Sequence, residues 1–184
     1  MAPTAAVRFT RVYEAHYADV LAYCARRVNR TEAEDVASEV FVVLWRRMER
    51  FEDEAPLPWL YSVAYRAISN RRRGAQHRVR LSERLRGMRH DEAEPAEDVV
   101  VRREQDRVVL EAISKLRPAD QEVLRLTLWE ESSPTEIAVV LGISRTAVDQ
   151  RYARAKRRLA RVLSSSFKSI VPAPVSIEEG GGPT

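Results

Sequence analysis

The sequence is poor in cysteine, with Cys24 alone among its 184 residues. A single cysteine excludes an intrachain disulfide and favours a reducing compartment. No apolar run approaches the roughly 18 residues that a membrane span needs, and the N-terminal stretch MAPTAAVRFT lacks the apolar core of a signal peptide. These absences predict a soluble, cytoplasmic protein that makes no membrane contact.

Residues that carry chemistry are equally scarce. The histidines His16, His77 and His90 pair neither with each other nor with Cys24 at a metal-ligand spacing. The chain has no glycine-rich phosphate loop, and no serine or cysteine nucleophile has a plausible base nearby. We therefore expect no bound metal, no cofactor and no enzyme activity, and we interpret Cys24 as a small core residue.

Charge and helical spacing are what the chain has in quantity. Apolar residues make up 45% of it and charged residues 32%, with a formal net charge of +4. This composition suits small domains with much surface, and the length allows two of them. The apolar residues recur every three or four positions and no segment alternates with period two, so the predicted fold class is all-α.

Three amphipathic helices are predicted in the first half of the chain, within a small domain of residues 8–73. The first helix covers residues 9–28. The second begins at a capping box formed by Thr31 and Glu34. The third follows the loop FEDEAPLP, carries Pro58 in its first turn, and leaves tyrosines and arginines on its outer face.

A change in charge marks the connection between the halves. Between Arg66 and Arg89 nine arginines stand against the single acid Glu83, and the acidic run DEAEPAED follows directly. Such a segregated, weakly apolar stretch cannot recover its ordering entropy by burial, so residues 74–98 are predicted to form a flexible linker. The Pro- and Gly-rich tail, residues 165–184, is predicted to be disordered.

The second half predicts four further helices in a domain of residues 99–164. One runs from residue 99 to 116, and another from 120 to 129. The next begins at Ser133 in a capping box with Glu136 and ends at Gly142, which takes a left-handed C-cap without steric cost. Ser144 then caps the last helix.

A short helix, a turn at Gly142 and a longer second helix form the helix-turn-helix pattern. The outward residues in the first turns of the second helix are in position to reach base edges, and we expect its remaining arginines to contact phosphates. The two sets together are Arg145, Thr146, Asp149, Gln150, Arg151, Ala153, Arg154 and Arg157. The alternative is a helical hairpin whose basic face is only solvated.

Three stretches occur in the order and spacing of a known family: AEDVASEVFVVLWRRMERF, PWLYSVAYRAISNRRR and LEAISKLRPADQEVLRLTLWEESSPTEIAVVLGISRTAVDQRYARAKRRLARVL. They resemble the two conserved domains of bacterial extracytoplasmic-function (ECF) sigma factors, the minimal sigma subunits of RNA polymerase. The resemblance spans about residues 9–163 apart from the linker. It implies a sigma domain two-like bundle at 8–73 and a sigma domain four-like helix-turn-helix domain at 99–164.

The resemblance implies a sigma factor that binds core RNA polymerase, directs it to specific promoters and helps to melt the −10 region. In the family one face of the second helix binds the clamp helices of the largest polymerase subunit. The matching residues here are Asp35, Ser38, Glu39, Val42 and Arg46. An acidic helix face with a few apolar groups suits a basic partner helix, and an ordinary solvated face is the alternative.

The family captures an unpaired base of the −10 element with the loop before the third helix, and tracks the strand along that helix. Flipped bases need a pocket and an aromatic, basic track. The matching residues are Phe51, Asp53, Tyr61, Tyr65, Arg66, Asn70, Arg72 and Arg73. Core packing is an equal alternative for Phe51 and the preferred one for Trp59. The helix beginning at Ser144 would read the −35 element.

The expected partners are therefore core RNA polymerase and promoter DNA, both double- and single-stranded, with an anti-sigma factor as a further candidate. The alternative function is a helix-turn-helix regulator that binds a palindrome as a dimer without polymerase. A third possibility is an adaptor without promoter activity. The acidic run of the linker would mimic phosphate in an RNA channel or be an ordinary solvated segment.

Overall fold

The computed structural model describes residues 4–51, 56–86 and 112–170, with side chains to residue 78 in the second range and to residue 161 in the third. The helices are α1 (Ala5–Ala25), α2 (Arg30–Arg47), the 3-10 turn η1 (Met48–Arg50), α3 (Pro56–Arg86), α5 (Pro118–Leu128), α6 (Pro134–Leu141) and α7 (Arg145–Ile170). Every regular element in these ranges is a helix, which confirms the predicted all-α class. No described helix combines the length and apolar character needed to cross a membrane.

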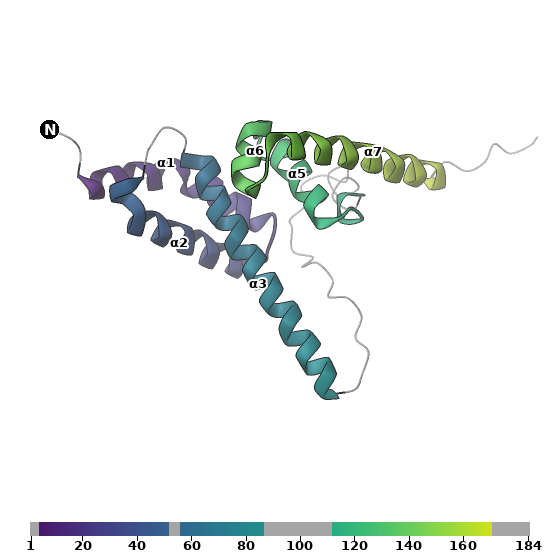
Figure 1. The fold of residues 1–184 in the computed structure, drawn as a ribbon, viewed down its shortest axis with the longest axis horizontal. Coiled ribbons are helices and arrows are strands. Elements are labelled where there is room, and N and C mark those ends of the chain that lie inside the picture. The colour runs from purple at the N-terminus through teal and green to yellow at the C-terminus, as the bar shows by residue number, and fades with distance from the viewer. Residues whose placement is uncertain (1–3, 52–55, 87–111, 171–184) are drawn as a thin grey trace, which may run out of the picture.

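Helices α1, α2 and α3 pack into a bundle (Figure 1). Its core includes Cys24, Val36, Leu44 and Leu60, each fully buried. The apolar residues of α2 that recur at helical spacing, Val36, Ala37, Val40, Phe41 and Leu44, are buried in this core. Trp45 is the exception, because the structure leaves it 52% exposed.

The start of α2 differs from the prediction. Asn29 is the N-cap, and its side chain accepts a hydrogen bond of 2.9 Å from the backbone N–H of Glu32. The predicted capping box of Thr31 and Glu34 is therefore wrong. Asparagine and threonine are both good N-cap residues, and the earlier one begins the helix here.

Helix α3 is longer than the prediction allowed. It continues to Arg86, through residues that were assigned to the flexible linker from Gly74 onward. Residues 75–86 are rich in good helix formers and contain no proline, and extending an existing helix costs far less than starting one. Charge segregation alone therefore did not mark the helix end. The rest of the predicted linker, residues 87–98, lies outside the described residues.

The helix-turn-helix region forms as the sequence indicated. Ser133 accepts from the backbone N–H of Glu136 at 3.3 Å, and the Glu136 carboxylate accepts from the Ser133 backbone N–H at 2.7 Å. Gly142 ends α6 in the left-handed region, with φ 63°. The Ser144 hydroxyl accepts from the Ala147 N–H at 3.2 Å and caps α7.

Some helix boundaries in the second half of the chain differ from the predicted ones, and others lie outside the described residues. Helix α5 begins at Pro118 rather than residue 120. Helix α7 continues to Ile170, past residue 165 where a disordered tail was predicted. Most of the helix predicted over residues 99–116, and the tail from 171 on, lie outside the described residues.

The two halves of the chain pack against each other. Helix α6 lies on α3, and α7 extends away from the α1–α3 bundle (Figure 1). One buried apolar cluster joins the bundle to Val123, Leu126, Ile137, Val140 and Val148 of the second half. A smaller cluster, which includes Ile113, Leu116, Leu124 and Ala155, belongs to the second half alone. No local pattern in the sequence predicted this contact between the domains.

Candidate nucleic-acid interface

Helix α7 presents the residues that were expected to contact the −35 element. Most of them are exposed, and Arg151 is half-buried. Arg145 and Asp149 form a loose ion pair of 4.0 Å, one helical turn apart. The exposed residues are Arg145, Thr146, Asp149, Gln150, Ala153, Arg154 and Arg157.

Two arginines of this set contact other groups of the same domain. Arg154 lies 3.6 Å from the Asp120 carboxylate of α5, whose side chain is almost fully buried. The Arg157 guanidinium donates to the backbone carbonyl of Ala153 at 3.3 Å. Both arginines remain exposed to solvent, so these contacts orient the side chains without hiding them.

Helix α3 carries an exposed polar stripe made of Arg66, Asn70 and Arg73. The spacing of four and three places these side chains on one face of the helix. Arg73 donates to the amide oxygen of Asn70 at 2.6 Å, which fixes both groups on that face. Asp53, the acidic residue of the predicted −10 set, lies outside the described residues.

The expectation that Tyr61 faces outward is wrong in this structure. Tyr61 is 4% exposed and stacks on Tyr23 of α1, with ring centroids 4.6 Å apart and planes 17° apart. Burial raises the pKa of Tyr61 to about 12. Tyr65 is half-buried, and Arg72 donates to the backbone carbonyl of Arg27 at 2.7 Å. Spacing along α3 predicted an outward face but not the elements that cover it.

Phe51 and Trp59 contact each other at the start of α3. Their rings meet edge to face at 4.9 Å, and both side chains are half-buried against the core. The Arg8 guanidinium of α1 donates to the Phe51 backbone carbonyl. Both aromatic rings therefore pack against the core, and each keeps part of its surface exposed.

The outer face of α2 is exposed along its whole length. It carries the residues expected to meet the polymerase: Asp35, Ser38, Glu39, Val42 and Arg46. Glu39 forms an ion pair of 3.1 Å with Arg71 of α3. Ser38 donates to the backbone carbonyl of Glu34 at 2.9 Å.

An aromatic groove lies beside this face, between α1 and α2. Helical spacing did not predict this groove, because it shows which residues of a helix share a face but not which of them a neighbouring helix leaves uncovered. Val42 and Trp45 are about half exposed along it, and Trp45 meets Phe9 edge to face at 5.2 Å. The lining residues are Phe9, Tyr13, Tyr17, Ser38, Phe41, Val42 and Trp45.

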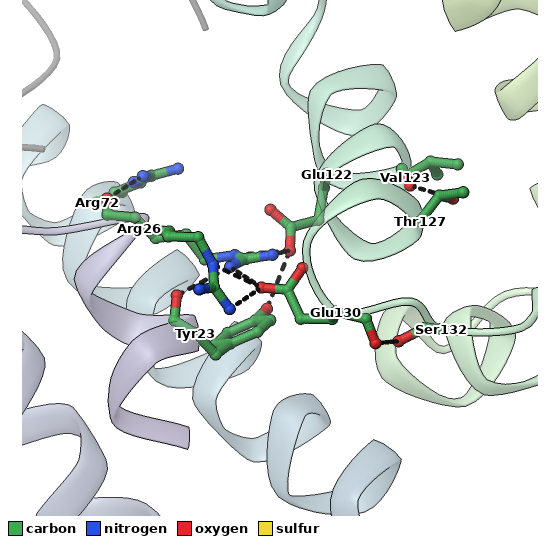
Figure 2. Close-up of polar contacts among 9 residues, drawn as sticks. Tyr23, Arg26, Arg72, Glu122, Val123, Thr127, Glu130 and Ser132 are labelled. Carbon is green, nitrogen blue, oxygen red and sulfur yellow. Dashed lines mark hydrogen bonds and ion pairs between the residues drawn. The ribbon is translucent and has the colours of Figure 1, made fainter. Parts of the chain in front are cut away.

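A buried ionic cluster joins α1 to α5 and the turn after it (Figure 2). The Arg27 Nε donates to Glu122 at 2.9 Å, and its Nη1 donates to Glu130 at 2.9 Å and to the Tyr23 carbonyl at 2.8 Å. Its Nη2 approaches the same Glu122 oxygen to 2.8 Å without hydrogen-bond geometry. Arg26 adds a second cation on Glu130, at 3.1 Å.

Tyr23 completes this cluster from α1. Its hydroxyl donates to Glu122 at 3.0 Å, and the Arg27 guanidinium carbon lies 3.5 Å from the centre of its ring. Burial raises the pKa of Tyr23 well above its ordinary value. Burial alone would raise the pKa of Glu122, but the Arg27 charge, the hydrogen bonds from Arg27 and Tyr23 and the Arg125 charge together more than offset this and lower it. The carboxylates likewise raise the pKa of Arg27 against the effect of burial.

No pattern in the sequence pointed to this cluster. Arg27 and Glu122 are 95 positions apart. The available signal was that Val20, Tyr23 and Arg27 follow the spacing of three and four, which places Arg27 in line with a buried stripe of α1 just past the end of that helix. Arginine is rarely fully buried unless it is paired, so a sequence with arginine at this position normally predicts an exposed side chain.

The fold and these faces define a class of protein: a two-part, all-helical DNA-binding protein with a helix-turn-helix in its second part. The family model of Sigma-70 region 2 matches residues 12–78, and that of Sigma-70, region 4 matches residues 106–159. The chain is 30% identical over 163 residues to the RNA polymerase sigma factor CnrH of Cupriavidus metallidurans, covering 82% of this chain and 84% of that protein. It is 27% identical over 158 residues to the RNA polymerase sigma factor YlaC of Bacillus subtilis, covering 84% and 91%.

Solved structures share the fold. The sigma factor RpoE of Bartonella quintana, in complex with the anti-sigma factor NepR, aligns with a TM-score of 0.65 at 20% identity, over 85% of this chain and 97% of that one. CnrH in complex with the cytosolic domain of CnrY aligns with a TM-score of 0.57 at 24% identity, over 85% and 88%. The chain belongs to the ECF family of RNA polymerase sigma factors, and it directs RNA polymerase to promoters.

Proposed function

We propose that this sigma factor binds core RNA polymerase through the outer face of α2 together with the aromatic groove beside it. The observation that supports this assignment is the exposure of Val42 and Trp45, at 48% and 52%, next to the exposed acids Asp35 and Glu39. Exposed apolar groups framed by charge are typical of a surface that another protein covers. A basic helix pair would meet both the apolar and the acidic parts.

A single substitution tests the polymerase surface. Val42→Glu places a charge in the middle of the face, and we expect it to weaken binding to core polymerase about tenfold or more, as truncation of an interface hot spot does. Val7→Glu is the matched control, because Val7 is 59% exposed on α1 and does not line the groove. Equal binding of the two variants in a core-polymerase titration would contradict the assignment.

The promoter surfaces are proposed on two helices. The first turns of α7 would read the −35 element through Arg145 and Gln150, with Arg157 on a phosphate. The stripe of Arg66, Asn70 and Arg73 on α3 would track the displaced strand of the −10 element. What supports both assignments is that these side chains are exposed on helices whose capping and packing fix their faces.

Replacing Arg66 and Arg73 together with alanine tests the −10 assignment. We expect run-off transcription and permanganate reactivity of the melted −10 thymines to fall together, while core binding stays unchanged. Arg30→Ala is a suitable control, since Arg30 is exposed on α2 away from both proposed faces. Unchanged transcription with the double variant would favour the adaptor alternative.

An anti-sigma factor is a proposed partner as well. The support is that RpoE, a solved structure with the same fold, is bound to the anti-sigma factor NepR, and that CnrH is bound to the cytosolic domain of CnrY. The protein would act by binding alone, in the cytoplasm where bacterial polymerase meets the chromosome. Tight, specific promoter binding by the free chain would instead favour the autonomous regulator.

A further inference from the structure

Asp120 is an almost fully buried acidic residue in the first turn of α5. Its side chain is 4% exposed and lies 3.6 Å from Arg154 of α7, while its oxygen Oδ2 is buried without a hydrogen-bond partner among the described residues. An aspartate is almost never fully buried unless it is paired. The amino end of α5 favours a negative charge at this position, and Arg154 of the DNA-reading helix supplies the opposite charge.

Arg154 lies on the face of α7 that was assigned to the −35 element. It follows Gln150 by four residues, so the two side chains share one face of the helix. The neighbouring Arg157 donates to the backbone of its own helix, at Ala153. Arg154 is instead held from a second helix, and its side chain remains 48% exposed.

The anchor of Arg154 stands beside a packed contact between two helices. Helices α5 and α7 pack on each other, and Leu124 and Ala155 belong to one buried cluster. Leu124 is one helical turn from Asp120, and Ala155 directly follows Arg154. Close packing of this kind leaves little freedom of movement, so the Asp120 carboxylate has a fixed place relative to α7.

The contact leaves the end of the arginine side chain available. It is made through Nε of Arg154, whereas the two terminal nitrogens carry four of the five N–H donors of a guanidinium. Two parallel hydrogen bonds from an arginine match the acceptor pair that guanine presents in the major groove. Arginine suits this role because its donors are planar and fixed relative to one another.

The carboxylate also changes which group of the DNA Arg154 prefers. An unrestrained arginine loses rotamer freedom when it binds a base edge, and it can instead reach a phosphate, which carries no sequence information. Holding the side chain beforehand reduces the entropy that is lost on binding. The negative charge of Asp120 also offsets part of the attraction between Arg154 and a phosphate. Both effects favour contact with a base.

We propose that Asp120 is a positioning residue of the −35 surface, which holds Arg154 so that its terminal nitrogens read a base pair instead of binding the nearest phosphate. The inference rests on the −35 assignment of α7 proposed above. It adds α5, which stands outside the helix-turn-helix of α6 and α7, to the elements that set promoter specificity.

Base discrimination tests this role in the full chain bound to core polymerase. Affinities are measured for a promoter identified by run-off transcription and for a set in which each −35 base pair is replaced in turn. We expect Arg154→Ala to lose discrimination at one base pair, and Asp120→Asn to reduce discrimination about fivefold or more at the same base pair. Asp120→Asn should have no further effect when Arg154→Ala is already present.

Non-specific binding gives a second readout with the opposite sign. On duplex DNA without a promoter, the Asp120→Asn complex should bind more tightly, and log K should depend on log salt more steeply by about 1, because the released Arg154 neutralises one more phosphate. A purely structural role for Asp120 would weaken binding to both kinds of DNA. Glu34→Gln should change neither readout, since it removes the same charge from an exposed ion pair on α2.

Glu122→Gln is the control for burial. Glu122 is a buried carboxylate of the same helix, and its hydrogen bonds are to Tyr23 and Arg27 rather than to α7, so base discrimination should stay unchanged. An equal loss of discrimination in Glu122→Gln would overturn the inference. A uniform loss of affinity across all −35 variants, in Asp120→Asn or in Arg154→Ala, would overturn it as well.

Failure of the inference differs from failure of the −35 assignment. If the assignment failed, neither Gln150→Ala nor Arg154→Ala would change base discrimination, whereas failure of the inference alone would leave the effect of Gln150→Ala intact. If Asp120→Asn lowers the helical content, Asp120→Ser decides the question, because it removes the same charge with a smaller side chain.

Discussion

At the scale of single residues, Gly142 has the most definite role in the second domain. It holds the turn between α6 and α7 at φ 63° and ψ 39°, where a side chain is strained by about 1–2 kcal/mol. A Cβ added there would meet no atom within 4 Å, so the cost is in the backbone alone. We expect Gly142→Ala to lower the free energy of unfolding by about 1 kcal/mol, measured by urea denaturation.

Asparagine provides the control at the same position. Asn tolerates the left-handed region better than Ala because its short side chain bonds locally. The free energy of unfolding of Gly142→Asn should therefore be closer to that of the original chain than the free energy of unfolding of Gly142→Ala. Equal stability of the glycine and alanine forms would mean that the turn relaxes to another conformation.

Cys24 gives a second prediction at this scale. The thiol is fully buried, and burial raises its pKa to about 12. Since only the thiolate reacts quickly, we expect iodoacetamide at mildly alkaline pH to leave Cys24 unmodified in the folded protein and to modify it in urea. Ser38→Cys is a positive control in the same chain, because Ser38 is exposed on α2. Rapid modification of folded Cys24 would show that the α1–α3 core opens locally.

At the scale of elements, α7 separates two kinds of DNA contact. Gln150→Ala should cost about 1–3 kcal/mol at one base pair and relax specificity there. Arg157→Ala should weaken binding to all sequences alike and reduce the dependence of log K on log salt by about 1. Both are measured with the polymerase complex on a promoter identified by run-off transcription.

The contrast between the two variants is itself the control. If Arg157→Ala changed the preferred base and Gln150→Ala did not, the register of α7 on the groove would differ from the one proposed. Both side chains are exposed, so neither change should alter the stability of the free protein by much more than about 0.5 kcal/mol.

The sequence predicted these elements best where the signal is local. Ser133, Glu136 and Gly142 act within a few residues of themselves, and the structure confirms their roles. The end of α3 was missed because no proline or glycine cap stands near Arg86 to oppose a helix that is already formed. The burial of Tyr61 was missed because it depends on another element, which helical spacing alone does not reveal.

At the scale of the whole molecule, the contact between the domains could not be read from the sequence. It depends on a pairing of Arg27 with Glu122 and Glu130 across roughly half the chain. Two domains and a connecting segment were predicted, but nothing in local spacing says whether two domains touch. Relative motion of domains is the default expectation unless the interface is large and apolar, and this interface combines a buried apolar cluster with the ionic one.

The charge on Glu122 makes domain closure depend on pH. When the two domains are in contact (the closed state), burial acts to raise the pKa of Glu122. The charges and hydrogen bonds of Arg27, Tyr23 and Arg125 together outweigh burial and lower this pKa from its ordinary 4.5. The closed state therefore binds fewer protons than the open state as the pH falls through 4.5, and acid favours opening. The other groups around this carboxylate are Tyr23 and Arg125, and neither titrates in acid. With fluorophores on Thr31→Cys and Ala160→Cys, which are exposed on α2 and α7, energy transfer should report a longer distance between the domains as the pH falls below about 4.5.

Far-ultraviolet circular dichroism distinguishes this opening from acid unfolding. The helical signal should persist through the change in distance, because the carboxylate–Arg27 contact joins the domains and is not part of either helix. In Glu122→Gln the acid step should be absent, since no carboxylate titrates at that position. A distance that changes only when helical content is lost, or an identical acid step in Glu122→Gln, would show that another group controls the contact between α1 and α5.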